Sequence, residues 1–177
     1  MLSIKPLKYP RLHMLNQNYL VTFDLKQMTK SKHLIRDDSF GELWNSQSIE
    51  LRGSIYVIGG TVANSHQYLK AARRLNEDTM CFEKLADMHY QRDAHGLISW
   101  KNRYIIAVGS WHGEESPMTC EMYDVQTNKW TILPKLSEQT CAPGLAIIGD
   151  RYLYKVGGNS DISQVSMLDL EKPDKWT

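Results

Sequence analysis

The chain has 177 residues, of which 42% are hydrophobic and 23% charged, a balance typical of a globular protein that buries one sizeable core. Its formal net charge of +1 provides no electrostatic field to collect a nucleic acid or an anionic membrane, so we expect neither as a partner. No apolar stretch reaches the roughly 18 residues of a membrane span. The three cysteines, Cys81, Cys120 and Cys141, lack metal-type spacing, which predicts reduced thiols, no metal or cofactor, and a cytoplasmic location.

Short β-type segments follow one another along the chain, and each ends in one of two markers. In chain order, the first apolar segment ends at Phe23-Asp24-Leu25, and the next, IYVIGG, ends in the pair Gly59-Gly60. The polar marker recurs at Asn76, Asp124 and Asp169, and the glycine marker recurs at Gly109 and at Gly157-Gly158. Both markers keep a spacing of roughly 50 residues, which indicates an internal structural repeat.

One repeat contains four predicted strands. Residues 95–110 and 143–158 match in register, and each contains a tight Lys-Asn or Gly-Asp turn between two strands. The stretch from Asp124 to Trp130 predicts a hairpin, because a polar Gln-Thr-Asn-Lys turn separates two runs of β-forming residues. Residues 67–75 have some helical spacing, yet the repeat requires a strand near their end, so we expect a long loop there.

A unit of four strands, with a glycine pair after its second strand and an aspartate followed by a spaced tryptophan, resembles the kelch repeat of β-propellers. The resemblance covers residues 16–177 and predicts an all-β fold, a kelch-type β-propeller in an incomplete arc of four-stranded antiparallel blades. We expect an N-terminal segment at 1–15, a partial blade at 16–36, and blades at 40–88, 92–136 and 140–177, the last one truncated. Because these supply only about three and a half repeats, further sequence or a second chain is expected to complete the ring.

The repeated residues have structural reasons to stand where they do. Glycine allows the second strand to turn sharply, or another backbone to come close, where blades crowd around a central channel. A tryptophan on the outer strand can fill the gap to the neighbouring blade, and a turn aspartate can accept hydrogen bonds from free backbone amides. We therefore assign structural roles to Gly59, Gly60, Gly109, Gly157, Gly158, Asp124, Trp130, Asp169 and Trp176.

No set of residues in the sequence predicts catalysis or metal binding. His95 is a lone histidine beside a glycine, a setting more typical of a structural polar group than of a base. Residues 111–115 carry metal-capable side chains, but no second histidine stands at ligand spacing. Gly59-Gly60 lacks the Lys-Ser or Lys-Thr of a phosphate-binding loop. The sequence therefore predicts a protein that is not an enzyme.

The resemblance to kelch propellers implies that partners bind the loops between second and third strands and the loops between blades. The first class of loop falls at 61–70, 111–119 and 159–164, and the second at 37–45, 89–93 and 137–143. These loops are rich in side chains that anchor interfaces, and Trp111 suits either a partner contact or packing over its own blade. The candidate partner-binding residues are Trp111, His112, Glu114, Glu115, His89, Tyr90, Arg92, His66 and Tyr68.

These observations favour a non-enzymatic protein–protein interaction module, a scaffold or adaptor in the cytoplasm or on the cytoskeleton. The acidic pair Glu114 and Glu115 beside Trp111 predicts a protein partner with a basic or amide-rich segment. Two alternatives stay open: a structural component of a large cytoskeletal or ciliary assembly, and a propeller enzyme that acts on a small carbohydrate. An enzyme would bring acidic or histidine side chains from several blades into one cavity, whereas a binding module would show a broad loop surface with an aromatic anchor.

Overall fold

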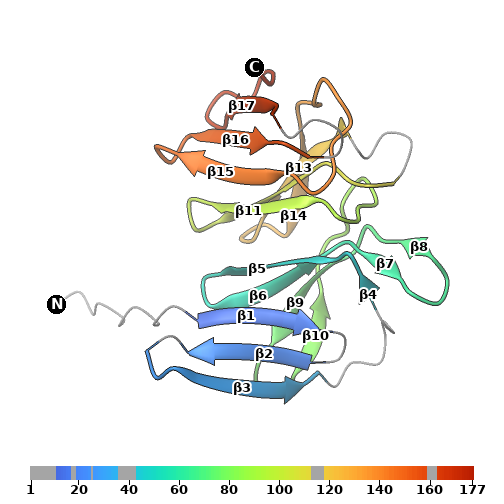
Figure 1. Ribbon diagram of the computed structural model, residues 1–177, viewed down its shortest axis with the longest axis vertical. Coiled ribbons are helices and arrows are strands. Elements are labelled where there is room, and N and C mark those ends of the chain that lie inside the picture. Colours follow the sequence, from blue (N-terminus) through green and yellow to red (C-terminus); the bar gives the residue numbers. More distant parts are fainter. Residues whose placement is uncertain (1–10, 17–18, 25, 36–42, 113–117, 159–162) are drawn as a thin grey trace.

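The computed structural model describes residues 11–16, 19–24, 26–35, 43–112, 118–158 and 163–177, and this part of the chain folds as β-strands and loops without an α-helix (Figure 1). Nothing within these ranges forms a helix that is long and apolar enough to cross a membrane. The all-β fold class predicted from the sequence is therefore confirmed.

Four antiparallel sheets follow one another along the chain, here numbered sheet 1 to sheet 4. Sheet 1 contains β1 (Arg11–Asn16), β2 (Tyr19–Asp24) and β3 (Thr29–Leu34), and sheet 2 contains β5 (Gln47–Leu51), β6 (Ser54–Ile58), β9 (Ala72–Asn76) and β10 (Cys81–Lys84). Sheet 3 contains β11 (Gly96–Trp100), β12 (Tyr104–Val108), β13 (Cys120–Asp124) and β14 (Lys129–Leu133), and sheet 4 contains β15 (Gly144–Ile148), β16 (Tyr152–Val156) and β17 (Val165–Asp169). A small side sheet joins β4 (Leu43–Trp44), β7 (Thr61–Val62) and β8 (Gln67–Tyr68).

The sheets form an open arc of blades, with sheet 1 and sheet 4 at opposite ends of the long axis (Figure 1). The strand β11 contacts both β5 and β15, so the first strands of sheets 2, 3 and 4 lie beside one another as the inner strands of a propeller do. In sheet 4 the backbone of Thr177 exchanges hydrogen bonds with that of Met167, at the place where a fourth strand pairs in sheets 2 and 3. These features confirm the predicted incomplete arc of kelch-type blades.

Two local features differ from the expectation drawn from the sequence. Sheet 1 begins at Arg11, inside the segment 1–15 that was expected to precede the first blade, because β1 pairs with β2 from Arg11↔Asp24 to Asn16↔Tyr19. The expected long loop at 67–75 contains β8 and β9, since its N-terminal part pairs with β7 and its C-terminal part with β6. Tertiary pairing decides the conformation of both segments, which local sequence patterns do not reveal.

In each of sheets 1 to 4 an Asp or Asn ends one strand, β2, β9, β13 or β17, and its side chain accepts hydrogen bonds from the turn that follows. Asp24 accepts hydrogen bonds from the amides of Lys26 and Gln27, both at 2.9 Å, and Asn76 accepts from Asp78 and Thr79 at 3.1 and 3.2 Å. The equivalent bonds run to Asp124 from Gln126 at 2.9 Å and to Asp169 from Glu171 at 3.0 Å. Sheet 1, which lacks the glycine marker, therefore shares the turn chemistry of the other repeats.

Two of these turn aspartates also bind an arginine from the start of the second strand. Arg103 donates two hydrogen bonds to Asp124, from Nε at 2.9 Å and from Nη2 at 2.6 Å. Arg151 makes the same bidentate contact with Asp169, and its hydrogen bonds lower the pKa of that carboxyl to about 2. The pair ties the turn before the second strand to the turn after the third, and both turns lie at the same end of the blade because Tyr104 pairs with Asp124 and Tyr152 with Asp169.

The glycine marker sits where the segment leading into the next blade crosses the second strand. Gly59 and Gly109 have φ of 61° and 72°, and a Cβ at either position would collide with the carbonyl oxygen of Arg92 or Thr140. The residue after each glycine donates its amide to the same carbonyl, Gly60 to Arg92 at 2.7 Å and Ser110 to Thr140 at 2.9 Å. Glycine thus permits both the turn and the close backbone contact.

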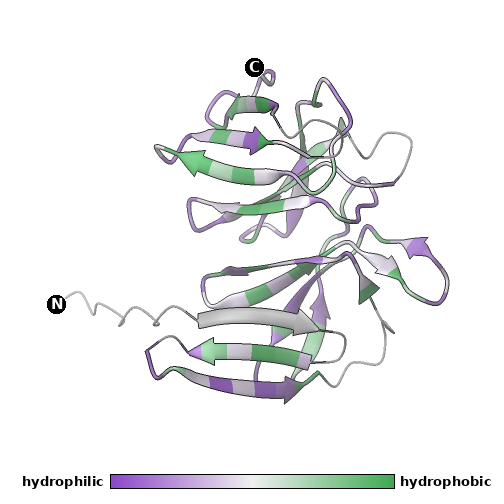
Figure 2. Cartoon of the chain, viewed as in Figure 1, coloured by the Kyte–Doolittle hydropathy of each residue, from purple (hydrophilic) through white to green (hydrophobic). Residues whose placement is uncertain are grey.

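Apolar side chains between the sheets form three successive cores, and Figure 2 shows the polar character of β3 at the lower end of the arc. Trp130 is 8% exposed and packs on sheet 2, where its Nε1 donates to the carbonyl oxygen of Ala86 at 2.8 Å. Trp176 repeats this contact one blade later, donating to the carbonyl oxygen of Pro134 at 3.0 Å. Each tryptophan therefore both fills the gap to the preceding blade and satisfies a carbonyl of the segment between blades.

Candidate functional site

The connection between the second and third strands of sheet 2 carries the side sheet. β7 and β8 form a hairpin, and β4 extends it because Trp44 pairs with Thr61. His66 lies in the hairpin turn with φ of 53°, and its ring lies 6.2 Å from that of Trp44 in an edge-on arrangement. Trp44 is 46% exposed, so this pair of rings faces solvent.

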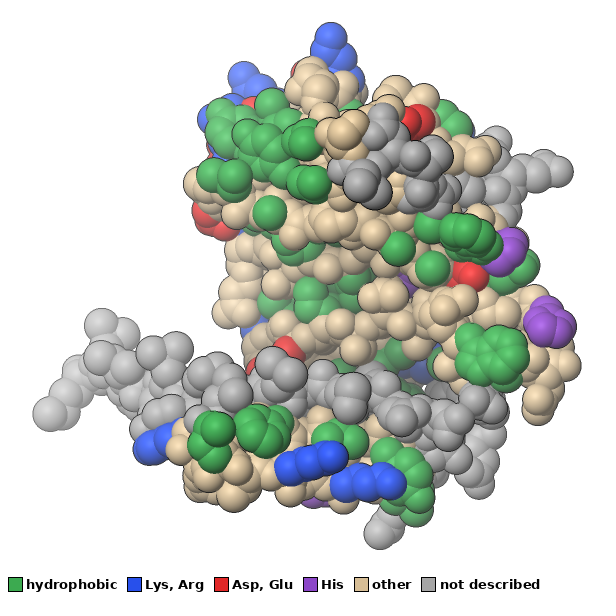
Figure 3. All heavy atoms as spheres, in the orientation of Figure 1, with side chains coloured by type: hydrophobic (Ala, Val, Ile, Leu, Met, Phe, Trp, Pro, Cys, Tyr) green, Lys and Arg blue, Asp and Glu red, His purple; other side chains and the backbone are tan. Residues whose placement is uncertain are grey.

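The equivalent connection of sheet 3 lies against the same hairpin. The ring of His112 stacks on Tyr68 of β8 at 4.5 Å with an interplanar angle of 21°, and Trp111 contacts His112 edge-on at 6.1 Å. Trp111 is 56% exposed. Two loops that are distant in sequence thus build one surface, the aromatic cluster, and Figure 3 shows hydrophobic and histidine side chains gathered along the edge where β4, β7 and β8 lie. The aromatic cluster consists of Trp44, His66, Tyr68, Trp111 and His112.

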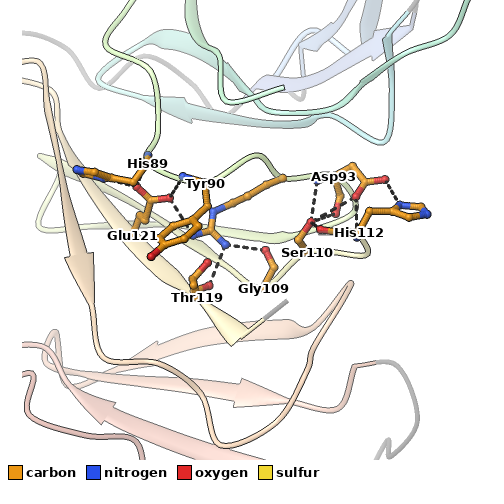
Figure 4. Close-up of polar contacts among 9 residues, drawn as sticks. His89, Tyr90, Asp93, Gly109, Ser110, His112, Thr119 and Glu121 are labelled. Carbon is orange, nitrogen blue, oxygen red and sulfur yellow. Dashed lines mark hydrogen bonds and ion pairs between the residues drawn. The ribbon is translucent and has the colours of Figure 1, made fainter. Parts of the chain in front are cut away.

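A buried carboxylate, Asp93, holds the second loop in place (Figure 4). Its oxygens accept hydrogen bonds from Ser110 Oγ at 3.3 Å and from Thr61 Oγ1 at 3.4 Å, and from the backbone amide of His112 at 3.2 Å. Nδ1 of the same histidine lies 3.1 Å from the carboxylate, which favours the tautomer protonated on Nδ1 and leaves Nε2 directed away from the loop. The imidazole is therefore held in position by contacts within the protein itself.

A second buried carboxylate, Glu121, organises the segment between sheet 2 and sheet 3. It accepts hydrogen bonds from the amides of His89 at 2.8 Å and Tyr90 at 3.1 Å, and it lies 2.7 Å from Nδ1 of His89. Arg92 Nη2 donates to it at 2.9 Å, while Nη1 donates to the carbonyl oxygens of Gly109 and Thr119 at 2.9 and 2.8 Å. Burial lowers the pKa of Arg92, and the adjacent carboxylate opposes that change.

The structure brings together part of the residue set that the sequence singled out. The aromatic cluster contains four of them, His66, Tyr68, Trp111 and His112. Two others lie in the segment between sheets 2 and 3, where His89 is half-exposed and Tyr90 is partly buried. Arg92 is 0% exposed and bonded internally, so the expectation that it touches a partner gives way to a supporting role. Glu114 and Glu115 lie outside the described residues.

Sequence reasoning missed Trp44, Asp93 and Glu121. Trp44 belongs to a strand of only two residues, which is too short to produce a recognisable alternation. Asp93 and Glu121 break the repeat, since Cys141 occupies the position matching Asp93, and Glu121 is a charged residue inside an otherwise apolar strand. Because a buried charge needs partners, the charged position within β13 was the available signal.

Two arrangements of side chains that support catalysis are a serine-hydrolase triad and a metal site. Ser110 donates to Asp93 and not to an imidazole, so the Ser-His-Asp arrangement of a hydrolase is not formed. Within the described ranges, no group of three or more His, Cys, Asp and Glu side chains lies together in a way that could hold a metal ion. His95 is 1% exposed, and burial, followed by the charge of Arg92, lowers its pKa to about 3, which leaves it neutral and inaccessible.

Comparisons with known proteins agree with the repeat. No family model matches the chain. It is 23% identical over 124 residues to a RING finger domain and kelch repeat-containing protein of Dictyostelium discoideum, and 30% identical over 136 residues to Kelch-like protein 35 of Mus musculus. It is also 32% identical over 76 residues to an influenza virus NS1A-binding protein homolog of Xenopus laevis.

These matches cover 70%, 73% and 43% of the chain, whereas the chain spans only 12%, 22% and 12% of the length of the three relatives. The matched regions and the four antiparallel sheets point to the same architecture. The chain is therefore similar to kelch-repeat proteins in both sequence and fold, and it carries a partial set of kelch-type propeller blades.

Proposed function

We propose that the chain is a non-enzymatic interaction module that binds a protein partner through the aromatic cluster. The observation that carries this proposal is the exposure of two tryptophans on one surface, 46% for Trp44 and 56% for Trp111. Large aromatic side chains contribute most to the affinity of protein interfaces, and they are rarely left together in solvent without a partner.

The contacts that hold His112 in place support the same function. His112 is held between Tyr68 and the buried Asp93, and the loop backbone is bonded to Asp93 as well. A surface that is already ordered loses little conformational entropy on binding, so more of the contact energy becomes affinity.

The internal use of the buried carboxylates supports a binding function over an enzymatic one. Asp93 and Glu121 accept hydrogen bonds from the protein's own backbone and side chains, which is the arrangement of loop supports. Among the three relatives above, one is named for binding a protein, the viral NS1A protein. We extend protein binding, and not that particular partner, to this chain.

The cysteines support a reducing compartment such as the cytoplasm. All three are free thiols, and burial raises the pKa of Cys120 to about 12, so this thiol stays protonated and unreactive. We therefore propose a cytoplasmic scaffold or adaptor.

The test compares capture of partners from a cell extract by the unchanged chain and by Trp111→Ala. The control is Ile132→Ala, because Ile132 is 48% exposed on β14 and lies outside the aromatic cluster. We expect a protein that the unchanged chain and Ile132→Ala retain and that Trp111→Ala loses. Calorimetry with that purified protein should show a loss of about 2 kcal/mol or more for Trp111→Ala.

The proposal fails if every protein retained by the unchanged chain is also retained at the same affinity by Trp111→Ala and Trp44→Ala. Both substitutions remove exposed side chains, so melting temperatures close to that of the unchanged chain will show that the fold is preserved.

A further inference from the structure

The strand that ends at the turn Asp or Asn, which is β2, β9, β13 or β17, has one position that faces the preceding sheet. It is the residue just before the turn Asp or Asn, and it is buried in sheets 2, 3 and 4, where Leu75, Tyr123 and Leu168 are 2%, 1% and 0% exposed. Each belongs to a core shared with the sheet before it. The equivalent residue in sheet 1 is Phe23, which is only partly buried.

A second position on the same strand meets the following sheet. It lies four residues before the turn residue, and it is buried in sheets 1, 2 and 3, where Leu20, Ala72 and Cys120 are 2%, 0% and 0% exposed. In sheet 4 the equivalent residue is Val165, which is 58% exposed. One interface therefore recurs three times along the chain, and one half of it remains uncovered at each end of the arc.

The uncovered half on sheet 4 is apolar. We call it the following face, and it consists of Val165, Val156 and Ile148. Val165 pairs directly with Val156 of β16, which is 45% exposed, and Ile148 of β15 is 59% exposed. The equivalent residues of sheet 3 are Val108 and Trp100, which are 0% and 7% exposed beneath sheet 4. The following face thus has the composition of a surface that is buried one blade earlier.

The uncovered half on sheet 1, the preceding face, combines apolar and basic side chains. Tyr19 and Leu34 pair across β2 and β3 and are 37% and 53% exposed, and Phe23 pairs with Lys30. Nζ of Lys32 lies 3.6 Å from the ring centre of Tyr19. Figure 3 shows green patches at both ends of the molecule, with blue side chains nearby at each end.

We propose that the following face of one copy docks on the preceding face of a second copy, head to tail. The two faces are the two halves of the interface that joins sheet 3 to sheet 4, so Phe23 of one copy would occupy the place that Leu168 has in that interface, against Val165 of the other copy. One chain cannot join its own two faces, because they lie at opposite ends of the arc (Figure 1). A second copy supplies the missing half with the same handedness and register.

Light scattering coupled to size-exclusion chromatography of the 177-residue chain tests this docking. We expect a mass of at least twice the 20.4 kDa of one chain, which falls as the sample is diluted. Val165→Glu and Tyr19→Glu should each shift the protein to the mass of one chain, because each places a carboxylate in one half of the interface. Ile132→Glu, at an apolar residue that is 48% exposed and lies outside both faces, should leave the mass unchanged.

Head-to-tail docking also predicts the result of mixing the two variants. The Val165→Glu protein keeps an intact preceding face and the Tyr19→Glu protein an intact following face, so their mixture should recover a species of twice the mass. The proposal is overturned if the unchanged chain has the mass of one chain at every concentration, or if Val165→Glu dissociates it and Tyr19→Glu does not. Trp111→Ala should leave the mass unchanged, which separates this docking from partner binding at the aromatic cluster.

Discussion

A methionine occupies a left-handed backbone position in two of the hairpin turns. Met28 and Met80 have φ of 52° and 57°, and the equivalent residue of sheet 3 is Asn128, with φ of 54°. The left-handed region costs most residues roughly 1 to 2 kcal/mol, and asparagine tolerates it better because its side chain can hydrogen-bond locally. The turns that contain methionine are therefore less stable than the turn that contains asparagine.

Met28→Asn should raise the free energy of unfolding by roughly 1 kcal/mol. Met28 is 70% exposed, so little packing is lost with the methionine side chain. Urea denaturation measures the change, and Met28→Leu is the control because leucine has the same backbone preference as methionine. Equal stability of the Asn and Leu variants would contradict the assignment of strain to this turn.

Stability should fall in mild acid because of His95. The folded-state pKa of about 3 lies below the ordinary value of 6.5, and neither ring nitrogen has a hydrogen-bond partner among the described residues. Above pH 6.5 the imidazole is neutral in both states. Between pH 6.5 and pH 3 only the unfolded chain binds the proton, so the free energy of unfolding falls by up to about 1.4 kcal/mol per pH unit.

Urea denaturation at pH 7 and pH 5 tests this dependence on His95. His95→Gln should show a smaller loss between the two pH values than the unchanged chain, since glutamine does not titrate. His33→Gln, which alters an exposed histidine of β3, should behave as the unchanged chain does. A loss that persists undiminished in His95→Gln would assign the acid sensitivity to other groups.

At the scale of the strand and its turn, two glycines distinguish the cost of a left-handed backbone conformation from the cost of a steric collision. Gly149, with φ of 62°, has no atom within 4 Å of a built Cβ, whereas at Gly109, with φ of 72°, the Cβ would collide with the carbonyl oxygen of Thr140. Gly149→Ala should therefore cost about 1 kcal/mol and Gly109→Ala about 2 to 4 kcal/mol. Thermal denaturation of the two variants measures the difference, and equal losses would refute the close approach at the repeat marker.

Trp130 packs the outer strand of sheet 3, β14, against sheet 2. Trp130→Ala should lower the free energy of unfolding by about 3 to 5 kcal/mol, because the indole is buried against sheet 2 and its N–H satisfies the carbonyl of Ala86. Trp111→Ala removes a side chain of the same size that is 56% exposed, and it should cost less than about 1 kcal/mol. Chemical denaturation compares them, and similar losses would contradict the packing between blades.

The sequence predicts best those elements that recur. The glycine marker, the turn aspartates and the spaced tryptophan each repeat, so their spacing reveals the blades. The contact of Arg103 with Asp124 was also readable in principle, because Arg151 and Asp169 stand at matching positions. The aromatic cluster could be predicted only in part, since the stack of Tyr68 on His112 joins two blades and depends on how the blades pack.

At the scale of the whole molecule, the arc gives apolar residues on one strand different contributions to stability. Leu168 faces sheet 3 and is 0% exposed, whereas Val165 on the same strand belongs to the following face. In a sample dilute enough to contain single chains, Leu168→Ala should cost about 2 to 5 kcal/mol and Val165→Ala less than about 0.5 kcal/mol. A large loss for Val165→Ala in single chains, measured by urea denaturation, would show that its face is covered from within the chain.

The limits of the blades were harder to predict than their number. Sheet 1 lacks the glycine pair and the tryptophan, so only Phe23-Asp24-Leu25 marked it, and the start of β1 at Arg11 follows from pairing with β2 and not from a motif. The side sheet was equally hidden, because its strands have two residues each and form only where β4 meets the hairpin.

The order in which the strands pair has a consequence for folding during synthesis on the ribosome. Every strand of sheet 3 pairs with its neighbour in sequence, so each of its hairpins can form within about 1 to 10 microseconds once its residues have emerged. Its apolar face toward sheet 4 stays bare until roughly 50 more residues have been made, which takes about 3 to 10 seconds at about 5 to 20 residues per second. During those seconds the bare apolar face of a nascent blade is accessible to chaperones, or to the matching face of another nascent chain on the same messenger RNA.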